Sequence, residues 1–205
     1  MIDSRVRRSL VSGLALGVAA MAAPGAAQAG LLTNGGFEDG LNGWVFTGDG
    51  VNDTASLSSD TPSGVGSSAY LDINAGAGLP WLQQDVPASV GDELTLTVSV
   101  KELVPNNPDA WIAAQVWLLP PDLGSILSSA ALFFTNPEWE TQSATVTVPA
   151  GATVARVLFT PQNPGFGVGT GEYLIDDVSL VAIPEPAGLL LAAVAIAALP
   201  GRRRR

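Results

Sequence analysis

The stretch LTLTVSVK, residues 94–101, alternates apolar and polar side chains without interruption. Because successive side chains of a β-strand point to opposite faces of a sheet, this pattern predicts a strand with one buried and one wet face. Similar short segments recur along the chain, separated by Gly, Pro, Asn and Asp, and no window shows the periodicity of an amphipathic helix. The sequence therefore predicts an all-β fold, an antiparallel β-sandwich or barrel.

The remaining strands are expected in segments that share this short, turn-bounded pattern. They are residues 31–33, 44–46, 55–58, 69–73, 81–86, 111–119, 131–134, 140–148, 154–159 and 173–181.

The first 29 residues have the layout of a secretory signal peptide. Three arginines, Arg5, Arg7 and Arg8, precede an apolar run at 10–23, and the small-x-small triplet Ala27-Gln28-Ala29 follows. The alternative, a short membrane anchor, needs a longer apolar span. We expect export through a secretion translocon.

Residues 184–205 form a second terminal signal. Its elements are Pro184-Glu185-Pro186, an apolar stretch at 187–199 that is short for a bilayer span, and the final basic cluster Arg202, Arg203, Arg204 and Arg205. This order resembles the PEP-CTERM sorting signal of Gram-negative, exopolysaccharide-producing bacteria. The resemblance implies an exosortase-type processing enzyme, a short transmembrane helix held transiently in the inner membrane, and a final place at the cell surface or outside the cell. The alternative is an ordinary weak tail anchor.

Residues 30–183 then remain as one folded domain. The whole chain has 205 residues with no His and no Cys, which excludes disulfides, Cys-ligated zinc, thiolate nucleophiles and His-dependent triads. Seven of the nine basic residues lie in the terminal segments, leaving Lys101 and Arg156 against 17 acidic residues and a net charge of −15. Such a domain lacks the basic face that nucleic acid requires, and a divalent cation would relieve its self-repulsion.

Two motifs at opposite ends of this domain carry a second resemblance. The opening LTNGGFEDGLNGW, residues 32–44, and the closing YLIDDVSL, residues 173–180, resemble those of carbohydrate-binding modules of the four/nine type. Trp139 and the segment that follows it occur in the corresponding place. The resemblance implies a galactose-binding-like jelly roll with its first and last strands close together.

The closing strand contains two adjacent carboxylates, Asp176 and Asp177, so one of them must point toward a packed layer. With two basic residues in the domain, a cation is a more economical partner for it than a salt bridge. The resemblance implies a structural Ca²⁺, with Glu38 and Asp177 as side-chain ligands and backbone carbonyls near Asn34 or at residues 49–54 completing the shell. Alternatively, these carboxylates cap turns by accepting hydrogen bonds from backbone amides.

Three tryptophans are candidates for a ligand surface. Trp111 and Trp117 share parity with Gln115, opposite the apolar set of the same strand, and the pair Trp81 and Gln83 repeats the arrangement. Aromatic planes bordered by amides suit sugars, which present apolar C–H faces and hydroxyls. We expect this surface, extended by Arg156, to bind polysaccharide; alternatively, a loop covers the rings.

The expected function is therefore that of an exported, non-catalytic surface or extracellular-matrix protein that associates with exopolysaccharide. A purely structural matrix or adhesion protein is the alternative. A glycoside-active enzyme is disfavoured because the acidic pairs Glu138 with Glu140 and Asp176 with Asp177 cannot face each other across a scissile bond.

Overall fold

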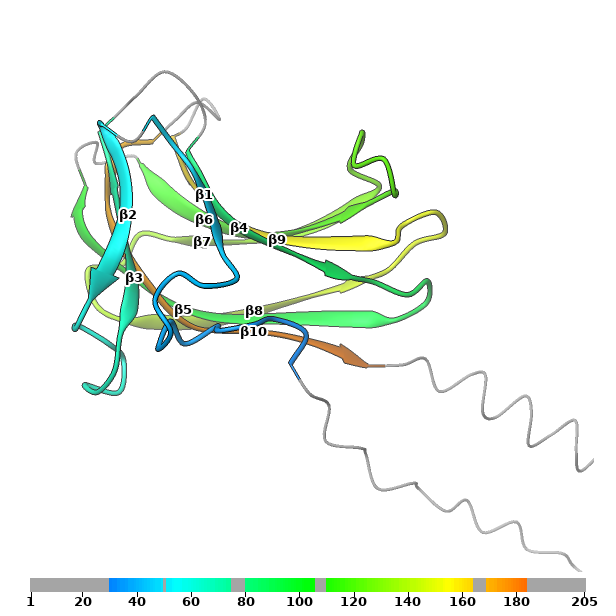
Figure 1. The fold of residues 1–205 in the computed structure, drawn as a ribbon, viewed down its shortest axis with the longest axis horizontal. Coiled ribbons are helices and arrows are strands. Elements are labelled where there is room, and N and C mark those ends of the chain that lie inside the picture. The colour runs from blue at the N-terminus through cyan, green and yellow to red at the C-terminus, as the bar shows by residue number, and fades with distance from the viewer. Residues whose placement is uncertain (1–29, 50, 75–79, 106–109, 164–168, 184–205) are drawn as a thin grey trace, which may run out of the picture.

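The computed structural model describes residues 30–49, 51–74, 80–105, 110–163 and 169–183. These residues form two antiparallel five-stranded sheets that face each other as two layers (Figure 1), so the expected all-β sandwich is confirmed. The strands are β1 (Val45–Thr47), β2 (Asp53–Ser58), β3 (Ser68–Ile73), β4 (Trp81–Pro87), β5 (Glu93–Pro105), β6 (Trp111–Leu119), β7 (Ser128–Phe134), β8 (Glu140–Thr147), β9 (Val154–Gln162) and β10 (Gly171–Ile183).

Consecutive strands are distributed between the two layers. Sheet A has the order β1-β4-β9-β6-β7 and sheet B the order β2-β3-β10-β5-β8. The central strands β9 and β10 therefore each have neighbours on both sides, and the inner faces of both sheets are covered by the opposite layer.

The alternation of residues 94–101 sets the inner and outer faces of sheet B. Leu94, Leu96, Val98 and Val100 are at most 1% exposed and belong to the core. On the opposite face, hydroxyl side chains of β5 and β8 pair across the strands, with 2.7 Å between Thr97 Oγ1 and Ser143 Oγ. The strand prediction at this segment is confirmed, and β5 extends it at both ends.

The segment before β1 does not form the strand expected at residues 31–33. Turns interrupt it, and Asn34 and Phe37 adopt positive φ values of 54°. Two backbone hydrogen bonds, Leu31 N to Leu180 O at 2.8 Å and Val178 N to Gly35 O at 2.9 Å, nevertheless lay this segment beside β10. The segment before β1 and the last strand are therefore close together, as the resemblance of the two terminal motifs implied, although that segment is not a strand.

The same segment supplies the core with two aromatic side chains. Phe37 and Trp44 are both buried, and their ring centroids are 5.4 Å apart. The expected signal peptide at 1–29 and sorting signal at 184–205 lie outside the described residues. Within the described ranges, no helix is long and apolar enough to span a membrane.

Candidate functional site

Side chains from three strands share the outer face of sheet A. On β6, Ile112, Ala114, Val116 and Leu118 point into the core, so the alternate positions Trp111, Gln115 and Trp117 point outward. The outward positions of β4 and β9 carry Trp81, Gln83 and Arg156. We call this set, together with Thr160, the aromatic face.

Strand register brings these residues together. Gln83 of β4 and Gln115 of β6 both pair with Leu158 on the central strand β9, so the two amides flank one leucine in a single row. In the next row, Arg156 lies between Asp85 and Trp117. All six residues that the sequence indicated for polysaccharide binding thus lie on one face.

The tryptophan rings are half-buried because they pack against other aromatic rings. Trp81 and Trp117 make an edge-to-face contact across β9, with ring centroids 6.2 Å apart and planes at 85°. Trp111 makes a similar contact with Phe133 of β7 at 6.1 Å and 87°. Edge-to-face pairs add about 0.5–1.5 kcal/mol beyond the area they bury, so the rings prefer these positions without being locked in them.

Two polar interactions order the face further. Trp117 Nε1 donates a hydrogen bond to Gln115 Oε1 at 2.9 Å, which fixes the orientation of the amide. Arg156 donates from Nε and Nη2 to the two carboxylate oxygens of Asp85, at 2.7 and 2.8 Å. These bonds raise the pKa of Arg156 above its ordinary value, against the opposing effect of burial.

Most of the unpaired buried polar atoms among the described residues lie on this face. Seven side-chain atoms are shielded from solvent without a hydrogen-bond partner, and five of them belong to the aromatic face: Trp81 Nε1, Gln83 Oε1, Trp111 Nε1, Gln115 Nε2 and Thr160 Oγ1. Leaving such a group unpaired costs about 1–3 kcal/mol. The unmet hydrogen bonds are therefore concentrated on one face, where a polar ligand or water would find partners.

Sequence reasoning missed Thr160 and Phe133. Thr160 has the same parity as Arg156, but we expected its strand to end at residue 159, whereas β9 continues to Gln162. Phe133 is 50% exposed and alternates with core residues Leu132 and Phe134 in a run of apolar residues that hides the pattern. Extending the alternation by one residue would have found the first; nothing in the local sequence singles out the second.

The candidate metal ligands lie near the contact between the N-terminal segment and β10. A shift in strand register between Asp176 and Ser179 leaves Asp177 exposed with φ of 50°, while Asp176 is only 5% exposed. The buried carboxylate is therefore Asp176. Burial raises its pKa to about 6, opposed by its hydrogen bond from the Asp177 amide and assisted by the charges of Asp177 and Glu38.

Carboxylates in this region also accept backbone hydrogen bonds. Glu38 Oε1 accepts from Ser67 N at 3.0 Å, and Asp49 Oδ1 accepts from the amides of Val51, Asn52 and Asp53. Among the described residues, no group of three or more acidic side chains converges as a metal site. A cation here would need backbone carbonyls for most of its shell, and the Ca²⁺ site stays a prediction.

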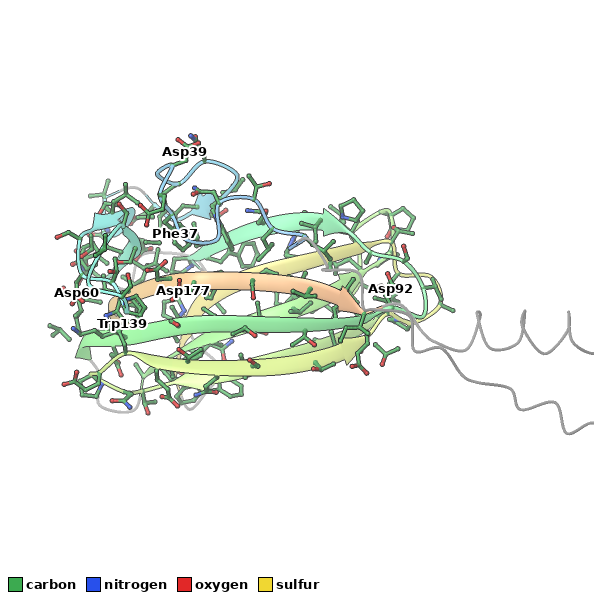
Figure 2. The ribbon with its side chains drawn as sticks, turned by 90° about the horizontal axis from the view of Figure 1, so that it is seen from below. Phe37, Asp39, Asp60, Asp92, Trp139 and Asp177 are labelled. Atoms are coloured by element: carbon green, nitrogen blue, oxygen red, sulfur yellow. The ribbon has the colours of Figure 1, made fainter. Side chains whose placement is uncertain are left out.

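The other two tryptophans have structural contacts. Trp44 is in the core, whereas Trp139 lies outside sheet B and donates from Nε1 to Asp60 Oδ1 at 3.0 Å. Lys101 Nζ contacts the other oxygen of Asp60 at 2.7 Å, and these bonds lower the pKa of Asp60. Figure 2 shows Asp60 beside Trp139 at one end of the sandwich, with Asp92 at the opposite end.

No family model matches the chain, and no curated protein matches it. Solved structures do. The CBM4 carbohydrate-binding module superposes with a TM-score of 0.51 at 20% identity, covering 74% of this chain and 99% of the module. The CBM22-1 xylan-binding domain from Paenibacillus barcinonensis gives 0.55 at 16% identity, with coverages of 78% and 99%.

A third similar structure is the enzymatically active domain of tailspike protein 4 from bacteriophage CBA120. Its TM-score is 0.61 at 17% identity, and the match covers 75% of this chain but only 21% of that one. At these identities the comparisons show the fold alone: the described residues form a jelly-roll sandwich similar to that of carbohydrate-binding modules.

Proposed function

We propose that this chain is an exported, non-catalytic protein that binds extracellular polysaccharide on its aromatic face. The observation that carries the proposal is the set of five unpaired polar atoms among three tryptophans on that face. A sugar chain offers both partners that such a surface lacks, because its C–H faces pack on aromatic rings and its oxygens meet the polar atoms.

Binding requires a local rearrangement. The five unpaired atoms are shielded from solvent, so a ligand reaches them when side chains of the face change rotamer. Each hydrogen bond gained on binding would relieve the cost of an unpaired group that the free protein carries.

The carboxylates on the face support a non-catalytic role. Glycoside hydrolysis uses two carboxyl groups on either side of the scissile bond. Among the described strand residues of sheet A, Asp85 is the one acidic residue, so a second carboxyl group is lacking there. Both of its oxygens accept hydrogen bonds from Arg156. One of the similar solved structures is itself described as a xylan-binding domain, which supports a binding role.

The export part of the proposal rests on the terminal segments. Cleavage after Ala29 would release the domain from the signal peptide, and the segment from Pro184 to Arg205 would hold it transiently at the inner membrane for an exosortase-type enzyme. N-terminal sequencing of the extracellular protein tests the first step, and its intact mass, compared with that of a chain lacking the four terminal arginines, tests the second. Retention of an uncleaved precursor inside the cell would contradict export.

The binding part is tested on a glycan array with the parent, Trp111→Ala and Trp117→Ala. We expect each variant to lose about tenfold or more in affinity, because each removes a ring of the aromatic face on which a sugar would stack. Trp139→Ala is the matched control, since this half-buried tryptophan precedes β8 of sheet B and contacts Asp60 rather than the aromatic face, and it should bind like the parent.

Two results would contradict the proposal. One is a parent that binds no glycan, which favours the purely structural role. The other is Trp117→Ala protein that melts normally and still binds every glycan that the parent binds. A loss of about 3–5 kcal/mol in stability would instead place Trp117 among core residues.

A further inference from the structure

The unpaired atoms of the aromatic face are unequal in kind. Trp81 Nε1 and Trp111 Nε1 are indole N–H groups, which can only donate. Gln115 Nε2 is also a donor, and the amide cannot be turned around without loss, because its Oε1 already accepts from Trp117 Nε1 at 2.9 Å. Three of the five unpaired atoms can therefore act only as hydrogen-bond donors.

Acceptors are scarcer on the same face. Gln83 Oε1 accepts, and the Thr160 hydroxyl can do either. The carboxylate of Asp85 is occupied by Arg156. A sugar hydroxyl can accept from such a donor, but its own proton then needs an acceptor, and on the aromatic face only Gln83 Oε1 and the Thr160 hydroxyl are unpaired groups that can accept. An acceptor that carries no proton therefore suits the three donors better.

Charge then separates two kinds of acceptor-rich sugar. Carboxylates of uronic acids would meet a domain of net charge −15, and both of its basic residues, Lys101 and Arg156, are engaged in ion pairs. Long-range repulsion would oppose their approach. The carbonyl of an acyl group is a strong acceptor without a charge.

We infer that the aromatic face selects neutral polysaccharides that carry acyl substituents, such as O-acetyl groups, whose carbonyls accept from Trp81, Trp111 and Gln115. This inference rests on the proposed function and adds the class of ligand to it. The methyl of an acetyl group also suits the ring-lined surface between these donors.

The test compares matched polysaccharides. O-acetylated xylan and O-acetylated glucomannan are each measured against the same polymer after mild alkaline de-O-acetylation, by affinity electrophoresis of the exported protein. Alginate is the anionic comparison. Removing the acetyl groups should weaken binding about tenfold, the effect of one hydrogen bond to a buried partner. Alginate should bind no better than the deacetylated polymers.

A pair of variants tests the donor itself. Gln115→Glu keeps an acceptor for Trp117 Nε1 but replaces the donating amide with a second acceptor. The ratio of the affinities for acetylated and deacetylated polymer should therefore fall toward one. Asn42→Asp adds the same charge at an exposed position in the segment before β1 and should keep the preference. Thermal melting of each variant checks that the fold is intact.

Selectivity for acetylated polymers and polysaccharide binding itself can fail separately. Equal binding of acetylated and deacetylated forms, or tighter binding of alginate, overturns the inference and leaves polysaccharide binding standing. No binding to any acetylated polymer also overturns it, and the array of unsubstituted glycans then decides whether the proposed function survives. If the Gln115→Glu protein keeps the full preference for acetylated polymer, Gln115 does not donate to the acyl carbonyl.

Discussion

Glu102 and Tyr173 are polar residues that meet inside the sandwich. They are register partners on β5 and β10, only 4% and 0% exposed, and neither Glu102 Oε1 nor the Tyr173 hydroxyl has a hydrogen-bond partner among the described residues. Glu102 occupies the next inward position after the alternating core residues of its strand. Burial raises the pKa of Glu102, and burial together with the Glu102 charge raises that of Tyr173.

Glu102→Gln should therefore stabilise the protein at high pH. A raised pKa means that the folded state favours the protonated acid, so this residue costs nothing below its ordinary value of 4.5 and lowers stability as the pH rises above it. Glutamine has no charge to bury. We expect the variant to melt a few degrees higher than the parent at pH 8 and at the same temperature at pH 4, in melting curves recorded across this range.

Glu93→Gln is the control for this comparison. Glu93 begins the same strand and is exposed, so its substitution should leave the pH dependence unchanged. If Glu102→Gln and the parent melt alike at both pH values, the buried carboxylate is not destabilising.

The N-terminal segment is an element whose stability depends on one close approach. Gly35 accepts a hydrogen bond from Val178 N at 2.9 Å, and a Cβ on Gly35 would collide with the Val178 carbonyl oxygen. Gly35→Ala should push the segment away from β10 and cost about 2 kcal/mol of unfolding free energy, measured by urea denaturation. Gly30→Ala is the control, because its Cβ would have no neighbour within 4 Å. Equal loss in both variants would contradict the docking.

The predicted Ca²⁺ site would join this same segment to β10. If Glu38 and Asp177 hold the ion, chelation should lower the melting temperature, because a ligand at a hundredfold excess over its dissociation constant adds about 2.7 kcal/mol. Glu38→Gln keeps an acceptor for the Ser67 amide but loses the charge, and it should abolish the response to Ca²⁺. Unchanged melting in chelator, with no metal found by elemental analysis, would refute the site.

At the scale of the whole molecule, the domain carries 17 acidic residues against two basic ones. Like charges repel in the compact state, and salt screens them over about 10 Å at 0.1 M. Raising NaCl from about 0.02 to about 0.5 M, in the presence of chelator to exclude effects of Ca²⁺, should therefore raise the melting temperature by a few degrees. A melting temperature that falls with salt would mean that the ion pairs Lys101–Asp60 and Arg156–Asp85 outweigh the general repulsion.

Local pattern was enough to predict the approximate positions of the strands from β1 to β10. At residues 94–101 and 111–119, successive side chains face the opposite sheet and the outer face in turn. This alternation can be recognised from adjacent residues alone. It failed at residues 31–33, where positive φ values at Asn34 and Phe37 turn the chain and single hydrogen bonds to β10 replace a ladder. Such turns depend on contacts with a strand more than 140 residues away.

The sequence by itself determined the two-faced strands, the acidic charge of the domain and the parity that turns Trp111, Gln115 and Trp117 the same way. Parity on one strand says nothing about its neighbours. Only the pairing of β9 with both β4 and β6 brought Trp81, Gln83 and Arg156 to the same face. Only tertiary packing likewise buried Asp176 rather than Asp177 and left the indole and amide groups unpaired, because register and burial depend on distant segments.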